Sequence, residues 1–157
     1  MIKKQKKQNK GFVLLFTIML SSIILAITLG VANVAIQEIK FSTNAKETNN
    51  AFFSTDTGAE CALYNDKTSG NSFVQTGGSG TVECLGNIFP LSGSYPVWNF
   101  SVSGLGNEGQ GCAKVVVDKS NLLKTVITSK GYNEGGSVVG SCTPGPNSIE
   151  RQLELSY

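Results

Sequence analysis

The 157-residue sequence contains no histidine. This absence excludes catalytic sites in which a histidine activates a serine or cysteine nucleophile. It also removes the commonest side-chain ligand of metal ions. The carboxylates Glu60, Asp66, Glu83, Glu108 and Asp118 are scattered along the sequence and form no pair suited to acid–base catalysis. We therefore predict a protein that is not an enzyme and that uses no cofactor and no metal ion.

Proline is absent before Pro90, and charged residues are absent from Gly11 to Ile36. A bilayer core about 30 Å thick needs about 20 apolar residues in a helix, so this segment is long enough to span a membrane. Because no proline interrupts the following residues, we expect one helix of about 50 residues, from Phe12 to about Tyr64. The polar run from Phe41 to Asn50 disturbs the apolar periodicity and leaves room for a local break.

Acidic residues are also absent from the first eleven positions, which hold five lysines: Lys3, Lys4, Lys6, Lys7 and Lys10. Positive charge beside a membrane span is retained in the cytoplasm, where the anionic lipids of the inner leaflet attract it. The pattern predicts a single-pass membrane protein with a cytoplasmic amino terminus and an extracytoplasmic remainder.

Three interpretations of this amino-terminal region differ in where the chain is cut. A secretory signal peptide would be removed after Ala32, where Gly30-Val31-Ala32 supplies small residues. An uncut membrane anchor would need only the lysines and the apolar run. In the third interpretation the cut lies before the span, which then stays with the mature protein.

The third interpretation rests on a resemblance. Lys10-Gly11-Phe12 followed at once by a long apolar run resembles the class III leader of type IV pilins and pseudopilins. The resemblance implies that a prepilin peptidase cuts after Gly11 and methylates the new amino-terminal Phe12. The segment 51–64 resembles the block that ends the long helix of PilX-type minor pilins, and the last ten residues resemble their final strand.

One position departs from the family pattern. Most pilins carry a glutamate four residues after the new amino terminus, where this sequence has Phe16. A similar absence is a feature of PilX-type minor pilins and of tip-located pseudopilins. The resemblance therefore implies a minor subunit of a type IV pilus that primes assembly or lies near the tip. A pseudopilin of a type II secretion system and a single-span surface adhesin outside any filament are the alternatives.

The same resemblance implies the partners and the location. Other pilins would contact the amino-terminal helix, the prepilin peptidase would process the leader, and the inner membrane would hold the chain until it enters a filament on the cell surface. Nucleic acid is not an expected partner. Once residues 1–11 are removed, eight lysines and arginines remain against eleven acidic residues, a side-chain charge of −3, whereas nucleic-acid binding normally requires a basic surface. The GxGxxG pattern at 104–109 is followed by no helix-forming run, so we expect a flexible turn.

Four cysteines, at positions 61, 84, 112 and 142, lie in the part expected outside the cytoplasm, where disulfides persist. Their wide spacing and the absence of a CxxC pair argue against a zinc site. Of the three pairings we favour Cys61 with Cys84 and Cys112 with Cys142, because each would join a glycine-rich loop to a neighbouring regular element. Each bond would stabilise the fold by about 3 kcal/mol.

Helix first and strands afterwards predicts an α+β fold of type IV pilin-like layout, in which the long helix packs on a small antiparallel sheet. The expected strands are Thr81–Leu85, Val97–Ser103, Cys112–Asp118, Lys124–Ser129 and Ile149–Tyr157, with a loop over 87–96 and a hairpin turn at Asp118–Asn121. Phe52 and Phe53 are expected to pack against the sheet. The predicted organisation is a leader (1–11), a transmembrane and assembly helix (12–36), an outer half of that helix (37–66) and a disulfide-stapled head (67–157).

Overall fold

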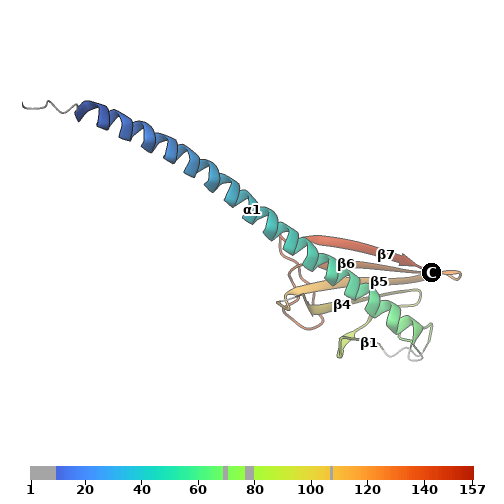
Figure 1. Cartoon of the computed structure of the whole chain (residues 1–157). Helices are drawn as coiled ribbons and strands as arrows, with labels where there is room; N and C mark the ends of the chain where they lie inside the picture. Colours follow the sequence, from blue (N-terminus) through green and yellow to red (C-terminus); the bar gives the residue numbers. More distant parts are fainter. Residues whose placement is uncertain (1–9, 69–70, 77–79, 107) are drawn as a thin grey trace, which may run out of the picture. The chain divides into compact units, whose positions relative to one another are not determined.

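The computed structural model describes residues 10–68, 71–76, 80–106 and 108–157. The chain divides into two compact units, Met1–Thr43 and Asn44–Tyr157. In the part of the chain that the structure describes, seven strands follow one long helix. Figure 1 shows the order along the chain, with the helix first and the strands after it. These elements are α1 (Lys10–Lys67), β1 (Thr81–Cys84), β2 (Asn87–Pro90), β3 (Ser92–Ser94), β4 (Val97–Leu105), β5 (Gly111–Asn121), β6 (Lys124–Tyr132) and β7 (Glu150–Ser156). The expected α+β fold, with a long apolar helix, antiparallel sheets and disulfides, is present.

Helix α1 continues through the polar run 41–50 without a break. The absence of proline explains this continuity, since every backbone N–H there is free to bond within the helix. The helix ends at Lys67. The positive charge of this residue in the last turn interacts favourably with the negative end of the helix dipole. The Thr68 N–H donates a hydrogen bond to the Tyr64 carbonyl and closes that last turn.

The main sheet has five strands in the order β3-β4-β5-β6-β7, and all neighbours are antiparallel. Strands β1 and β2 pair only with each other, as a separate hairpin. Strands β2 and β3 occupy the segment expected to be a loop, so that prediction was wrong. Both strands are short, with four and three residues, which explains why no alternating pattern was visible.

The hairpin between β5 and β6 turns later than expected. Asn121 still pairs with Lys124, so the turn lies at Leu122 and Leu123 and not at Asp118–Asn121. Side-chain oxygen atoms account for the shift: the Ser120 N–H donates to the carboxylate Oδ1 of Asp118 at 2.7 Å, and the Leu123 N–H donates to the amide Oδ1 of Asn121 at 3.0 Å. The first of these local bonds stabilises the end of β5, and the second stabilises the turn that follows it.

The face of α1 that meets the sheet is built from small side chains. Its buried members in that stretch include Ala51, Ser54, Thr55, Ala59 and Ala62. Phe52 and Phe53 are 50% and 59% exposed, so the prediction that they pack against the sheet was wrong. Close approach of the helix to the sheet backbone leaves space only for small side chains.

Aromatic side chains fill the centre of the core. Phe73, which follows α1, lies with its ring centroid 5.8 Å from that of Trp98 and 6.1 Å from that of Phe100, both in β4. Val82 and Phe89 of the β1–β2 hairpin join the same buried cluster. The hairpin therefore packs against the core although it belongs to a separate sheet.

Candidate functional site

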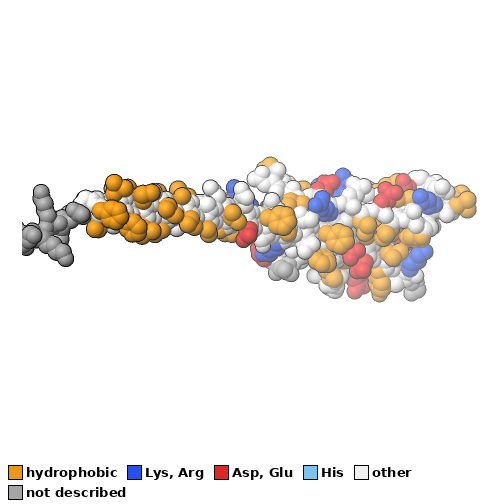
Figure 2. All heavy atoms as spheres, turned by 45° about the horizontal axis from the view of Figure 1, so that its top comes forward, with side chains coloured by type: hydrophobic (Ala, Val, Ile, Leu, Met, Phe, Trp, Pro, Cys, Tyr) orange, Lys and Arg blue, Asp and Glu red, His pale blue; other side chains and the backbone are white. Residues whose placement is uncertain are grey.

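The apolar segment of α1 is the first candidate site, because none of its side chains is covered within the protein. Residues 11–36 are all exposed, and among the described residues α1 is the one helix long and apolar enough to cross a membrane. Phe12, the residue expected at the mature amino terminus, is 74% exposed. A side chain at Gly11 would meet nothing within 4 Å. Figure 2 shows how densely apolar side chains cover this part of the helix.

Three hydroxyl groups within this segment donate hydrogen bonds to carbonyl groups of the same helix. Thr17 Oγ1 donates to the Leu14 carbonyl at 2.9 Å, and Ser22 Oγ donates to the Met19 carbonyl at 2.8 Å. Thr28 Oγ1 bonds in the same way to a carbonyl one turn earlier. Such bonds remove the cost of placing a hydroxyl group in hydrocarbon. The segment can therefore face either lipid or the apolar surface of another helix.

The described part of the leader is its last two residues, Lys10 and Gly11. Lys3, Lys4, Lys6 and Lys7 lie outside the described residues. Lys10 is the first residue of α1. The predicted cleavage bond between Gly11 and Phe12 therefore lies within the first turn of the helix.

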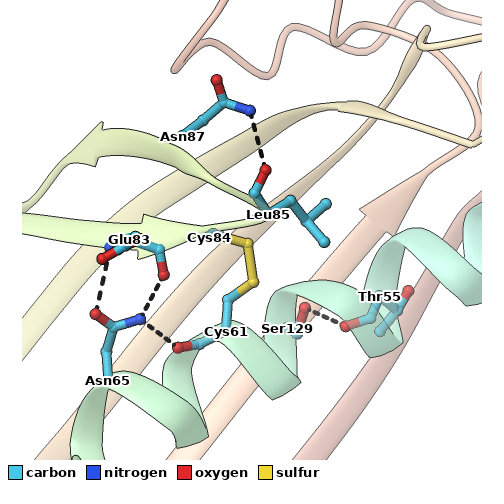
Figure 3. The surroundings of a disulfide bond; sticks show 8 residues. All are labelled: Thr55, Cys61, Asn65, Glu83, Cys84, Leu85, Asn87 and Ser129. Atoms are coloured by element: carbon cyan, nitrogen blue, oxygen red, sulfur yellow. Dashed lines mark hydrogen bonds between the residues drawn. A yellow bond between two sulfur atoms is a disulfide. The ribbon is translucent and has the colours of Figure 1, made fainter.

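The head is fastened by two disulfides, Cys61–Cys84 and Cys112–Cys142. This is the pairing that the sequence favours. The first bond joins α1 to the β1–β2 hairpin, and Asn65 reinforces it one turn later. Asn65 Nδ2 donates to the Glu83 carbonyl at 2.8 Å, and the Glu83 N–H donates to Asn65 Oδ1 at 3.3 Å (Figure 3). The hairpin is thereby held to the helix at two successive positions.

The second disulfide fixes the loop that precedes β7. Cys112 and Cys142 are buried together with Tyr132. Tyr132 Oη donates to Glu150 Oε2 at 2.6 Å. Burial first, and then this bond, raise the pKa of Tyr132 to about 12. The same bond lowers the pKa of Glu150.

Asp66 is a buried carboxylate at the end of α1 where the helix dipole disfavours negative charge. Two partners compensate for this position. Lys119 forms an ion pair with its Oδ1, and Tyr157 Oη donates to its Oδ2 at 2.6 Å. Burial, and then the bond to Asp66, raise the pKa of Tyr157 above its ordinary value. Asp66 therefore joins the end of the helix to β5 and to the carboxyl-terminal residue, which is a structural role.

The remaining carboxylates are distributed over the head. Glu108 pairs with Lys46 at 3.3 Å, and the hydrogen bonds from Ser120 lower the pKa of Asp118. Glu60 and Glu83 line one hollow between α1 and the β1–β2 hairpin, a proximity that their separation in sequence did not reveal. The described residues contain no group of three histidine, cysteine or acidic side chains placed to hold a metal ion.

The glycines of the GxGxxG pattern lie at the end of β4 and in the connection from β4 to β5. Gly104, Gly106 and Gly109 adopt positive φ values of 76°, 78° and 66°. A strand follows them, whereas a dinucleotide site requires a helix at that place. The pattern therefore makes a turn, as expected from the sequence.

Searches of protein-family models, of curated proteins and of solved structures found no match to this chain. The described residues form an exposed apolar helix segment and a head that is cross-linked by two disulfides and carries hollows on its surface.

Proposed function

We propose that the protein is a minor-pilin-like structural subunit of a type IV pilus, which primes filament assembly or lies near the filament tip. The observation that carries this proposal is the continuity of α1. One uninterrupted helix contains the exposed apolar segment and also the residues that the disulfide Cys61–Cys84 joins to the head. An apolar helix covalently continuous with a folded head is what a filament subunit requires.

A subunit of this kind has to leave the membrane when it enters a filament. Extracting residues 11–36 into water would expose almost every apolar side chain of the segment, at a large hydrophobic cost. The cost disappears when neighbouring helices cover that surface as lipid is withdrawn. Other pilins that contact the helix would therefore serve as the partners that replace the inner membrane.

The leader supports the same proposal. In this account the prepilin peptidase recognises the basic residues before Gly11, cuts after that glycine and methylates Phe12. Glycine suits a position that must enter a protease cleft, because it carries no side chain. A signal peptidase cut after Ala32 would instead divide α1 in the middle of its helical run.

Phe16 favours a minor role over that of the repeating subunit. A phenylalanine side chain cannot form an ion pair with the terminal amine of a neighbouring subunit. The contact attributed to the usual glutamate is therefore lost. A subunit without that contact is better suited to a few positions in the filament than to all of them.

The stoichiometry of purified filaments tests this proposal. We expect the chain in sheared filaments at a small fraction of the main subunit, and fewer filaments when its gene is deleted. A chain that dominates the filament would contradict the minor role. Its presence in membranes with no effect on filaments would favour the single-span adhesin, and a loss of protein secretion without loss of pili would favour the type II pseudopilin.

A further inference from the structure

A hollow of about 300 Å³ lies between α1 and the β1–β2 hairpin. It is lined by Glu60, Cys61, Tyr64, Glu83, Cys84, Leu85 and Gly86. The disulfide and the Asn65 bonds hold its two walls together (Figure 3). The hollow is thus preorganised, and a ligand entering it would not have to order the hairpin first.

Leu85 is the unusual residue of this hollow. It adopts a φ of 52°, and the next residue, Gly86, adopts a φ of 74°. Hairpin turns with two successive positive φ values prefer asparagine, aspartate or glycine at these positions. A leucine is strained in this conformation. Its side chain is also 68% exposed, so burial within the protein does not compensate for the strain. The turn therefore presents an apolar side chain to solvent at a position where the fold itself favours another residue.

Further exposed apolar side chains surround Leu85. Tyr64, on the opposite wall, is 63% exposed, and Ile88 is 68% exposed. Ile88 lies directly across from Glu83 in the hairpin register. Val139, which is 75% exposed, shares a second hollow with Leu85. Leu85 therefore belongs to two hollows: one shared with Tyr64 of α1, and one shared with Val139 that is otherwise lined mainly by serine, asparagine and glycine.

The charged groups around this surface are acidic. Glu60 and Glu83 are exposed, and neither carboxylate has an ion-pair partner among the residues that the structure describes. No lysine or arginine lines the hollow. The nearest cation along α1, Lys67, lies instead over the ring of Tyr157, with its Nζ 3.9 Å from the ring centroid. The surface is complementary in charge to a basic partner.

We propose that this hollow docks a polypeptide segment in which lysine or arginine adjoins a large aliphatic side chain. The aliphatic side chain packs on Leu85 and Ile88. The cation lies over the face of Tyr64 and between the carboxylates of Glu60 and Glu83, where both ring and charges attract it. The site is independent of the proposed filament function, because none of its residues lies in the apolar segment 11–36.

Titration of the full chain in detergent micelles with short synthetic peptides tests this proposal. The probe is an acetylated and amidated peptide with alternating arginine and leucine, and the two controls replace its arginines by glutamate or its leucines by serine. We expect saturable shifts of the backbone NMR signals at 60–64 and 83–88 with the arginine–leucine peptide alone. The absence of such shifts, or equal shifts with the glutamate peptide, would overturn the proposal.

Two sets of variants make the test specific. The double variant Glu60→Gln, Glu83→Gln removes both charges and should weaken binding about fivefold to tenfold. Leu85→Asn should weaken binding by a similar factor, yet leave the melting temperature unchanged or higher, because asparagine tolerates positive φ. Leu123→Asn, at a residue 94% exposed on another hairpin, is the matched control and should bind normally. Unchanged binding by Leu85→Asn would overturn the proposal, because the leucine would then not contact the peptide. A lower melting temperature would overturn it as well, by showing that the leucine serves the fold.

Discussion

Gly58 of α1 lies so close to Ser129 of β6 that a Cβ atom on the glycine would stand 2.6 Å from the serine Oγ. The same Cβ would stand 2.8 Å from Ala113 Cβ in β5. Ser129 Oγ cannot simply turn away, because it donates a hydrogen bond of 2.7 Å to the Thr55 carbonyl. The helix therefore rests on the sheet at a distance that only glycine permits.

We predict that Gly58→Ala lowers the free energy of unfolding of the head by about 1–3 kcal/mol, the usual cost of overpacking a filled core. Gly30→Ala is the matched control, since it lies in the same helix with nothing within 4 Å of its added Cβ. Both changes improve helix propensity, by about 1 kcal/mol, but only the first creates a clash. Denaturant unfolding in detergent would measure the difference. Equal stability of the two variants would contradict the close contact.

The disulfide Cys61–Cys84 supports a second prediction, about the β1–β2 hairpin. This hairpin shares no strand pairing with the main sheet, so its attachment depends on the disulfide, on Asn65 and on its buried side chains. Replacing both cysteines by serine should cost about 3 kcal/mol and should speed amide exchange in β1 and β2 more than in β4–β6. The pair Cys112→Ser, Cys142→Ser is the control and should instead loosen residues 133–149. Uniform loss of protection in both variants would show that the hairpin is not a separate unit.

Sequence patterns predicted the long helix, the strands β1 and β4 to β7, and the disulfide pairing. The helix and the strands follow from local periodicity, and the pairing follows from the order of the cysteines along the chain. Sequence patterns did not predict which face of α1 meets the sheet. Phe52 and Phe53 are more hydrophobic than the small residues that face the sheet. The space between helix and sheet decides the contact, however, because the backbone of Gly131 lies against Thr55. Such close approach is a property of two elements together, which neither stretch of sequence displays alone.

The hollow beside Leu85 could not be predicted for a similar reason. Glu60 and Glu83 are separated by the end of α1, and only the folded hairpin brings them to one place. A leucine before glycine at the end of a strand pattern was the one available signal, since this turn favours asparagine or aspartate.

Tyr132 and Glu150 give a prediction about pH. The pKa of Tyr132 is raised to about 12 from an ordinary value of 10.0, so its contribution to stability is complete below pH 10 and is lost as the pH rises toward 12. The pKa of Glu150 is lowered, so this residue affects stability at acidic pH. Its contribution to stability is present above its ordinary pKa and is lost as the pH falls through the lowered value.

Two variants separate the causes of these shifts. Because the bond from Tyr132 is the main cause at Glu150, Tyr132→Phe should raise the pKa of that carboxyl, as carboxyl carbon NMR would measure. Glu150→Gln should lower the Tyr132 pKa only in part, since burial is the larger cause there. Tyr95→Phe is the control and should leave the Glu150 titration unchanged. An unaltered Glu150 pKa in Tyr132→Phe would contradict the hydrogen bond.

The apolar segment gives a prediction about membrane insertion. Leu25 is 63% exposed near the centre of the uncharged run, and Leu25→Asp should disfavour insertion by about 3 kcal/mol. We expect a larger fraction of the chain to be extracted from membranes at alkaline pH. Leu123→Asp changes a leucine of the head that is 94% exposed and should leave extraction unchanged. Unaltered membrane association of Leu25→Asp would contradict a span at this position.

The leader gives a prediction about processing. A bulky side chain after the lysines should block the peptidase, so Gly11→Leu should accumulate with its leader attached and without methylation. Gly30→Leu is the control, because this glycine is equally free of neighbours but lies away from the expected cut. Normal processing of Gly11→Leu, or failure of both variants, would contradict cleavage at Gly11.

The mass of the mature chain from the native cell tests the central claim most directly. The account predicts a protein that lacks residues 1–11, begins with methylated Phe12 and retains the whole of the apolar helix. A mature chain that still carries Lys3 to Lys10, or one that begins near Asn33, would contradict it.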